Sequence, residues 1–345
     1  MSGHDLQFDR ACGALIGMAI GDAMGMPSQT LPRTDIIRLY GRITTFVDPF
    51  PDHPVSHGLK AAQVTDDTEQ AFLLAERLIA DQGALDETRW AQDLLGWEAD
   101  VRERGLRDLL GPSSKAALDG IMAGKPASET GRNGTTNGAA MRISPVGIAC
   151  PINPMSGLLD AVELACRMTH NTGEAIAGAA AVAAVVSCGI EGLAFDAAIE
   201  PALQAAAIGQ KRGFPVGEQE MAQRISAALA AADTGLSAEA LADGIGTSVA
   251  SHESVAAAFG VVRLAGCDPW EAAKIAANIG DDTDTIGAIA GAMAGACVGQ
   301  SGIAPNAVKT VLDANDLPLE KIASGLLRLR SNSEKRFADN TRVER

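Results

Sequence analysis

Two short acidic segments carry the side chains on which the chemistry of this sequence depends. The first is Thr65-Asp66-Asp67-Thr68-Glu69, and the second is Asp281-Asp282-Thr283-Asp284-Thr285. Carboxylates and hydroxyls, without thiol or imidazole, suit hard cations such as Mg²⁺, Mn²⁺ or Ca²⁺. Thr and Asp at a helix start can also be simple caps. Four or five consecutive oxygen-bearing side chains exceed what one cap needs. Each segment alone still favours capping, and only the two together favour a metal site.

Each acidic segment opens a predicted helix. The apolar residues that follow recur every three or four positions, as on one helix face: Phe72, Ala75, Leu78 and Ile79 after the first segment, and Ile286, Ile289, Ala290, Met293 and Cys297 after the second. Acidic residues favour a helix N-terminus. Two such acidic starts repel each other unless a cation lies between them, so together they predict one shared metal site.

Glycine rows mark two of the predicted helices. Glycines recur every fourth residue from Gly13 to Gly25 and again from Gly287 to Gly295. Because an interior glycine costs a helix about 1 kcal/mol relative to alanine, each row needs compensation. Residues four apart share a helix face, so each row is a groove that admits another backbone. Core packing alone explains such rows, but a close contact could also bring two helix ends to one site.

A glycine-rich segment, Gly131 to Arg142, is the predicted substrate cradle. Its glycines and asparagines allow unusual backbone angles, and Thr135, Thr136 and Asn137 offer donors to a diphosphate or sugar. A plain loop is the alternative. Two further positions share this ambiguity. Ser113, with Ser114 beside it, could bind phosphate or cap a helix, and His170 could contact the ligand or be structural.

These segments resemble the motifs of the ADP-ribosylglycohydrolase family, which includes the dinitrogenase-reductase-activating glycohydrolases and the crystallin J1-like proteins. TDDT and GDDTDTIGAIAGA resemble its paired metal motifs, and GALIGMAIGDAMGMPSQ resembles its opening helix. NGTTNGAAMRISPVG resembles its ligand loop, and Thr169-His170 its Thr-His pair. The motifs stand in family order from about residue 10 to residue 300, and together they are specific.

The resemblance implies an all-α, orthogonal multi-helix bundle with two Mg²⁺ ions, for which Mn²⁺ could substitute. Carried over position by position, it assigns metal binding to Thr65, Asp66, Asp67, Asp282, Asp284 and Thr285, and catalysis to Asp66, Asp67 and Asp284. It assigns substrate binding to Gln29, Ser113, Thr135, Thr136, Asn137, Gly138 and His170. Asp281 stands where the family usually has glycine, so it is left out of the metal ligands.

The activity that the resemblance implies is hydrolysis of a glycosidic bond at the anomeric carbon of ribose. The transition state of such a reaction is oxocarbenium-like. Two ions would orient the ribose hydroxyls and lower the pKa of a bound water, which a carboxylate would align for attack. The expected partner is a ribosyl or ADP-ribosyl small molecule, or a modified protein.

Gln29 departs from the family pattern, which commonly has glutamate there. A glutamine can hydrogen-bond but cannot act as an acid or base at neutral pH. Another carboxylate would then take over, with Glu69, Asp100 and Asp108 as candidates, or the substrate would be a smaller ribosyl glycoside. A non-catalytic ADP-ribose-binding or crystallin J1-like protein with a residual metal site is the alternative function.

A second alternative comes from the order of residues in the later acidic segment. Asp282-Thr283-Asp284-Thr285 is also similar to the aspartyl-phosphate motif of haloacid dehalogenase-like phosphatases. That motif follows a strand and opens the fold. Here it lies late in the chain, after an alanine-rich segment with helical character, which disfavours a phosphatase.

Composition places these segments in one helical domain. The 345 residues are 47% hydrophobic but only 3% aromatic, which favours closely packed alanine-rich helices. A net charge of −15 disfavours binding to nucleic acid and to anionic membranes. The apolar run from Ala175 to Ile190 is short for a membrane span and is predicted to be a buried helix. Residues 1–330 are the expected domain and 331–345 a frayed polar tail.

The six cysteines have no CxxC spacing and are interpreted as reduced thiols of the core. Reduced thiols are typical of a cytoplasmic protein. For the oligomeric state, a monomer is slightly favoured.

Overall fold

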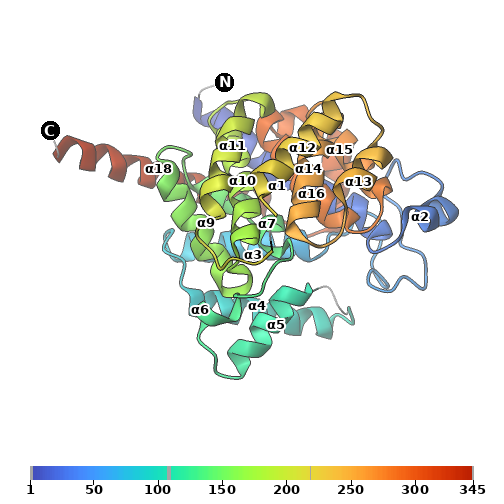
Figure 1. The fold of residues 1–345 in the computed structure, drawn as a ribbon, viewed down its shortest axis with the longest axis horizontal. Helices are drawn as coiled ribbons and strands as arrows, with labels where there is room; N and C mark the ends of the chain where they lie inside the picture. The colour runs from blue at the N-terminus through green and yellow to red at the C-terminus, as the bar shows by residue number, and fades with distance from the viewer. Residues whose placement is uncertain (1–2, 107–109, 218, 344–345) are drawn as a thin grey trace.

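A computed structural model describes residues 3–106, 110–217 and 219–343. Over these residues the chain forms eighteen α-helices and two short 3-10 helices, with no β-strand (Figure 1). In chain order they are α1 (Gly3–Gly25), η1 (Met26–Ser28), α2 (Arg33–Tyr40), α3 (Asp66–Ala80), α4 (Glu87–Glu103), α5 (Pro112–Met122), α6 (Ala127–Thr130), α7 (Gly138–Met141), α8 (Ser144–Ala149), α9 (Met155–His170), α10 (Gly173–Ile190), α11 (Phe195–Gly209), α12 (Met221–Asp233), α13 (Ala238–Ile245), α14 (Ser251–Leu264), α15 (Pro269–Ile279), α16 (Thr283–Val298), η2 (Gln300–Gly302), α17 (Pro305–Ala314) and α18 (Leu319–Val343).

The helices cross one another in several directions rather than lying parallel (Figure 1). The prediction of an all-helical bundle is confirmed. The phosphatase alternative is wrong, because the strand that must precede its aspartate is absent: helix α15 stands directly before the second acidic segment.

The two glycine rows pack against each other at the centre of the fold. A Cβ atom added to Gly21 would lie 1.9 Å from the carbonyl oxygen of Gly287, and one added to Gly17 would lie 2.3 Å from that of Gly291. Gly13 meets Gly295 while Gly25 meets Thr283, so α1 and α16 run antiparallel. The predicted groove is confirmed. Its consequence is that the end of α1 lies beside the start of α16.

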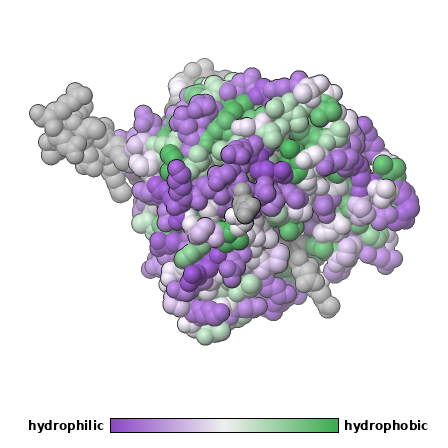
Figure 2. All heavy atoms as spheres, in the orientation of Figure 1, coloured by the Kyte–Doolittle hydropathy of each residue, from purple (hydrophilic) through white to green (hydrophobic). Residues whose placement is uncertain are grey.

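The core around this pair is built mainly from alanine and aliphatic side chains. Helix α10 is the one helix of the described residues that is long and apolar enough to cross a membrane, and all of it is buried inside the protein. The prediction of a buried helix over Ala175–Ile190 is confirmed. On the face shown in Figure 2, hydrophilic side chains cover most of the surface, with hydrophobic ones scattered among them.

The C-terminal region differs from the predicted frayed tail. Helix α18 continues through residue 331 to Val343, and its last part extends away from the body of the protein (Figure 1). Its sequence contains many good helix formers, and Arg330 pairs with Glu334 one turn later, at 3.6 Å. Residues 344–345 lie outside the described residues.

Candidate active site

Three aspartates from three different helices meet at the end of the α1–α16 pair. One carboxylate oxygen from each of Asp22, Asp67 and Asp284 lies within 4.8 Å of the other two. The three side chains belong to α1, α3 and α16, and each is at most 2% exposed. The shared site that the two acidic segments predicted is therefore present. Asp22 is a member that the sequence analysis did not name.

Asp22, which belongs to α1, holds the first acidic segment in place by hydrogen bonds. Its carboxylate accepts hydrogen bonds from the backbone N–H and hydroxyl groups of both Thr65 and Thr68, at 2.6 to 3.1 Å. Backbone N–H groups in the first turn of a helix have no partner within the helix. Asp22 therefore caps α3 in place of a residue of α3 itself, and fixes the direction in which Asp66 and Asp67 leave the helix.

The N-cap side chains of α3 and α16 do not cap these helices. Thr65 and Asp282 occupy the N-cap positions of α3 and α16, and neither side chain makes a capping hydrogen bond. Asp67 Oδ2 accepts hydrogen bonds from Thr65 Oγ1 at 3.2 Å and Thr285 Oγ1 at 3.4 Å. Asp67 Oδ1 is buried and has no donor among the described residues. Because a buried carboxylate oxygen without a partner is costly, this atom and its neighbours fit a bound cation.

Burial raises the pKa values of all five acids here, and repulsion from a neighbouring carboxylate adds to the rise in Asp66, Asp67, Asp282 and Asp284. Burial raises the pKa of Asp22 and of Asp282 to about 6. The pKa values of Asp66, Asp67 and Asp284 lie well above the ordinary range, first through burial and then through the neighbouring carboxylates. Five acids held this close favour protons or a cation, since an isolated buried carboxylate is strongly disfavoured.

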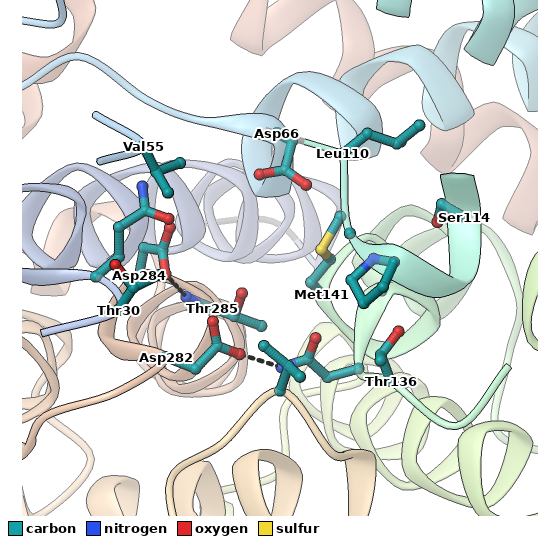
Figure 3. Close-up of a pocket in the computed structure, with 16 residues that line it drawn as sticks. Thr30, Val55, Asp66, Leu110, Ser114, Thr136, Met141, Asp282, Asp284 and Thr285 are labelled. Carbon is teal, nitrogen blue, oxygen red and sulfur yellow. Dashed lines mark hydrogen bonds between the residues drawn. The ribbon is translucent and has the colours of Figure 1, made fainter. Parts of the chain in front are cut away.

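A pocket lies above this cluster (Figure 3). Asp66, Asp282, Asp284 and Thr285 form one side of its wall, and Ser114 and Thr136 lie on the opposite side. Apolar side chains complete it, namely Val55, Leu110, Pro112, Met141 and Val249. Acidic groups opposite hydroxyl donors, with an apolar surround, suit a polyhydroxylated ligand.

The glycine-rich segment is an ordered wall of this pocket. Asn137 Nδ2 donates to Asp282 and, at 2.9 Å, to Ser254 Oγ. The backbone of residues 135–137 pairs with residues 249–251, with Asn137 N donating to Val249 O at 2.9 Å. Residues 131–137 of this segment form turns and loop, and its second half contains the short helix α7. Its hydrogen bonds to Asp282 and to residues 249–251 hold the segment against the acidic cluster.

Two of the predicted substrate contacts, Ser113 and Thr135, do not line this pocket. Ser113 faces a neighbouring pocket with Lys125 and Asn133, and its neighbour Ser114 faces the acidic one. Thr135 uses its carbonyl oxygen to accept from Ser251 N at 3.0 Å.

His170 is fully buried behind the pocket and hydrogen-bonds Thr136 Oγ1 at 3.0 Å. A Cβ atom on Gly138 would lie 2.9 Å from the His170 ring, so the glycine-rich segment passes directly over the imidazole. Burial first, and then Arg142, hold the pKa of His170 well below its usual range. We therefore correct its role from ligand contact to support of Thr136.

A buried polar chain connects the two sides of the site. Arg142 donates to Gln70 Oε1 at 2.6 Å and to Thr169 Oγ1 at 2.5 Å. Gln70 Nε2 in turn donates to Asp66 Oδ2 at 3.3 Å, and Thr169 Oγ1 hydrogen-bonds His170 Nδ1 at 2.7 Å. This chain orients both Asp66 and the glycine-rich segment. The sequence suggested Thr169 and His170 as a pair but gave no reason to single out Gln70.

Gln29 lies on the pocket wall, 7% exposed, and donates through Nε2 to Ser56 Oγ at 2.9 Å. Two candidate replacements for the family's glutamate lie elsewhere. Glu69 is bound to Arg104 and to the Trp97 ring N–H, and Asp100 pairs with Arg104. Both predictions are wrong, because the side chains point to the surface side of α3 and α4. Asp108 lies outside the described residues.

Asp281 is exposed and has a φ of 65°. This left-handed conformation favours glycine, the residue that the resemblance leads us to expect at this position. Omitting Asp281 from the metal ligands agrees with its place in the structure.

Comparison with known proteins agrees with this geometry. A family model for ADP-ribosylglycohydrolase matches residues 3–336. The protein belongs to the ADP-ribosylglycohydrolase family. It is 36% identical to the Escherichia coli (strain K12) protein YegU over 95% of this chain and 99% of that protein. It is 28% identical to ADP-ribosylarginine hydrolase Tri1 of Pseudomonas putida (strain GB-1), over 88% of this chain and 74% of the relative.

A solved structure of an ADP-ribosylglycohydrolase-related protein complex has the same fold. Its TM-score is 0.68 at 24% identity, covering 94% of this chain and 99% of that one. The fold class expected from the motifs is therefore confirmed by both sequence and structure.

Proposed function

We propose that this protein is a metal-dependent hydrolase that cleaves the glycosidic bond at the anomeric carbon of ribose in a ribosyl or ADP-ribosyl substrate. The observation that supports it most is the meeting of Asp22, Asp67 and Asp284 beneath a pocket, with one buried carboxylate oxygen lacking a partner. Family membership supports the type of reaction, since the Tri1 relative is named as a hydrolase of ADP-ribosylarginine.

The cations proposed for this site are two Mg²⁺, or Mn²⁺ in their place. Asp66, Asp67, Asp282 and Asp284 would bind them, with the hydroxyls of Thr65 and Thr285 nearby. Asp22 already accepts hydrogen bonds from four donor groups, so we assign it mainly to positioning α3. Bound divalent ions would supply positive charge that orients ribose hydroxyls and makes a water more acidic.

Asp66 is the proposed proton-transfer group. It lines the pocket beside Asp282 and Asp284. Gln70 engages Asp66 Oδ2, which leaves Oδ1 to exchange a proton with water or with the leaving group. A carboxylate on the pocket wall is placed to act in general acid–base catalysis.

The opposite wall would hold the rest of the ligand. Ser114 lies in the first turn of α5, whose N-terminal end borders the pocket at Gly111 and Pro112. Hydroxyl and backbone donors at a helix start favour an anionic or hydroxyl-rich group. Thr136, held by His170 from below, supplies a second hydroxyl from the glycine-rich segment.

The test is a screen of ribosyl and ADP-ribosyl compounds with Mg²⁺ or Mn²⁺, followed by mass spectrometry of the released ribose-containing product. Turnover should disappear on chelation and in Asp284→Asn, because both remove charge from the site. Asp281→Asn is the matched control, since it changes an exposed acid two residues after the end of α15 and should retain activity. Turnover that is unaffected by chelation and by Asp284→Asn would refute the proposal.

A non-catalytic ADP-ribose-binding protein is the second candidate, favoured by one observation. Gln29 stands on the pocket wall where the family commonly has glutamate, and it hydrogen-bonds Ser56 rather than carrying a proton. In that case ADP-ribose would bind and stabilise the protein in a metal-dependent way, yet none of the screened compounds would be cleaved.

A further inference from the structure

Cys267 and Cys297 form a thiol pair at the surface end of α15 and α16, away from the proposed active site. Both line a second pocket together with Phe195 and Arg263. Cys267 Sγ reaches the carbonyl oxygen of Ala294, in the last turns of α16, at 4.0 Å. Cys297 lies three residues after Ala294 on the same face of α16, so the fold brings the two cysteine side chains to one place. Their sequence positions have no spacing typical of a redox motif, so only the fold reveals the pair.

We propose that Cys267 and Cys297 form a reversible disulfide that closes the open end of the hairpin made by α15 and α16. The turn of this hairpin, Gly280 to Asp282, leads into the acidic residues at the start of α16. Cys267 lies just before α15 and Cys297 one residue before the end of α16. The bond would therefore fix the hairpin at the end opposite Asp282.

The environments of the two thiols assign them different roles. Cys267 is half-buried, and the hydrogen bond from Cys297 lowers its pKa, so it is the better nucleophile. Cys297 is 7% exposed, and the same hydrogen bond followed by burial raises its pKa. Arg263, which is ion-paired with Asp196 at 2.9 Å, adds a cation to the pocket wall. Cys267 is thus the attacking thiol and Cys297 the resolving one.

The oxidant is a low-molecular-weight disulfide such as glutathione disulfide. The Cys267 thiolate attacks one sulfur of that disulfide, the S–S bond breaks, and one small thiolate leaves. The Cys297 thiol then loses its proton to the released thiolate and attacks the Cys267 sulfur, so that the second small thiol leaves. Two protein thiols are oxidised and one small disulfide is reduced to two thiols.

The experiment treats the full-length protein with glutathione disulfide, alkylates the remaining thiols under denaturing conditions, and maps the peptides by mass spectrometry without reduction. Wild-type protein should lose two of its six thiols and yield a Cys267–Cys297 cross-linked peptide. Cys297→Ser should instead accumulate glutathione on Cys267, because no resolving thiol remains, and Cys267→Ser should do neither.

Cys150→Ser is the matched control. Cys150 is also half-buried, but burial raises its pKa to about 11, so this variant should react like wild type. The oxidised wild-type and Cys150→Ser proteins should also melt at a higher temperature than their reduced forms, because the bond constrains the unfolded chain.

Three results would overturn the proposal: no reaction, glutathione remaining on Cys267 of the wild-type protein, or a different cross-link such as Cys188–Cys297. If the oxidised protein melts at the same temperature as the reduced one, the disulfide does not stabilise the α15–α16 hairpin, and that part of the proposal is overturned.

Discussion

Asp22 illustrates how one side chain connects both halves of the candidate site. Asp22→Asn should lower the free energy of unfolding by about 1–3 kcal/mol, because an amide NH₂ would face donors from Thr65 and Thr68 that now bond a carboxylate. The same variant should reduce the rise in melting temperature on adding Mg²⁺. Urea denaturation and thermal melts with and without metal measure both effects.

The comparison for Asp22→Asn is Asp281→Asn, which alters an exposed acid. Exposed substitutions usually change stability by less than about 0.5 kcal/mol. Equal behaviour of the two variants would show that Asp22 does not organise the site.

The raised carboxylate pKa values predict an unusual pH dependence for the metal-free protein. The pKa of Asp282 is about 6 when folded, against an ordinary value of 3.8. Between these values the folded state binds more protons than the unfolded state, so this group's contribution to stability falls as the pH rises. Denaturation in EDTA should therefore show a smaller contribution from the site at pH 7 than at about pH 4, and Mg²⁺ should offset the loss.

Asp282→Asn separates this effect from others, because asparagine can still accept a hydrogen bond from Asn137. In EDTA the variant should lose less stability between these pH values than the wild-type protein does. A pH profile identical to that of the wild type would mean that Asp282 does not contribute to it.

Gln29→Glu places a titratable group on the pocket wall. Because a new acid or base would join the five carboxylates, we expect tighter metal binding and a changed pH dependence of turnover. Calorimetry with Mg²⁺ and rate measurements across pH test this, with the exposed Gln223→Glu as control. Unchanged metal affinity and pH profile would place residue 29 outside the working site.

Residues that form clusters were visible in the sequence, whereas isolated ones were not. Asp66, Asp67, Asp282 and Asp284 were predictable because consecutive acids exceed the needs of a helix cap. Asp22 stands alone in the apolar, glycine-rich second half of α1, and its role depends on which helix end it meets. The signal that could have found it is the cost of burying an acid on such a helix.

At the scale of the elements, the contact between α1 and α16 holds the site together. Gly21→Ala would place a methyl group 1.9 Å from the Gly287 carbonyl oxygen. Backbone atoms cannot rotate away, so the helices must separate. We expect a loss of about 3 kcal/mol together with weaker metal binding, as measured by denaturation and calorimetry.

Gly96→Ala is the control, because a Cβ atom there meets nothing within 4 Å. It should raise stability by up to about 1 kcal/mol through helix propensity alone. Comparable losses in both variants would show that the effect of Gly21→Ala comes from the helix itself and not from the contact.

Helices with a clear apolar period were predictable, but contacts between distant segments were not. The glycine rows indicated that another backbone packs against each of these helices. Only the fold shows that α1 and α16 pack against each other. The resemblance suggested a ligand contact for His170, and only the fold shows that His170 is buried and hydrogen-bonded to Thr136. The polar composition of residues 331–345 indicated a tail, whereas helix propensity prevails through Val343.

At the scale of the whole molecule, Arg330 joins the C-terminal helix to the core. It is 1% exposed and donates to the carbonyl oxygens of Gly147, Ile148 and Cys150, and to Glu191 at 2.5 Å. Arg330→Ala should cost about 3 kcal/mol, because these acceptors lose a buried partner. Denaturation is the measurement, and the exposed Arg328→Ala should stay within about 0.5 kcal/mol of wild type. A similarly small change for Arg330→Ala would show that α18 does not depend on it.

The antiparallel contact between α1 and α16 also sets the order of events during biosynthesis. Thr283, which donates to the Gly25 carbonyl oxygen, is translated 258 residues later. At about 5–20 residues per second, roughly tens of seconds pass between the synthesis of α1 and the synthesis of α16, which covers its glycine face. Neither Asp22 nor Asp67 can meet Asp284 before then. A chain that terminates before α16 therefore cannot assemble the cluster of three aspartates.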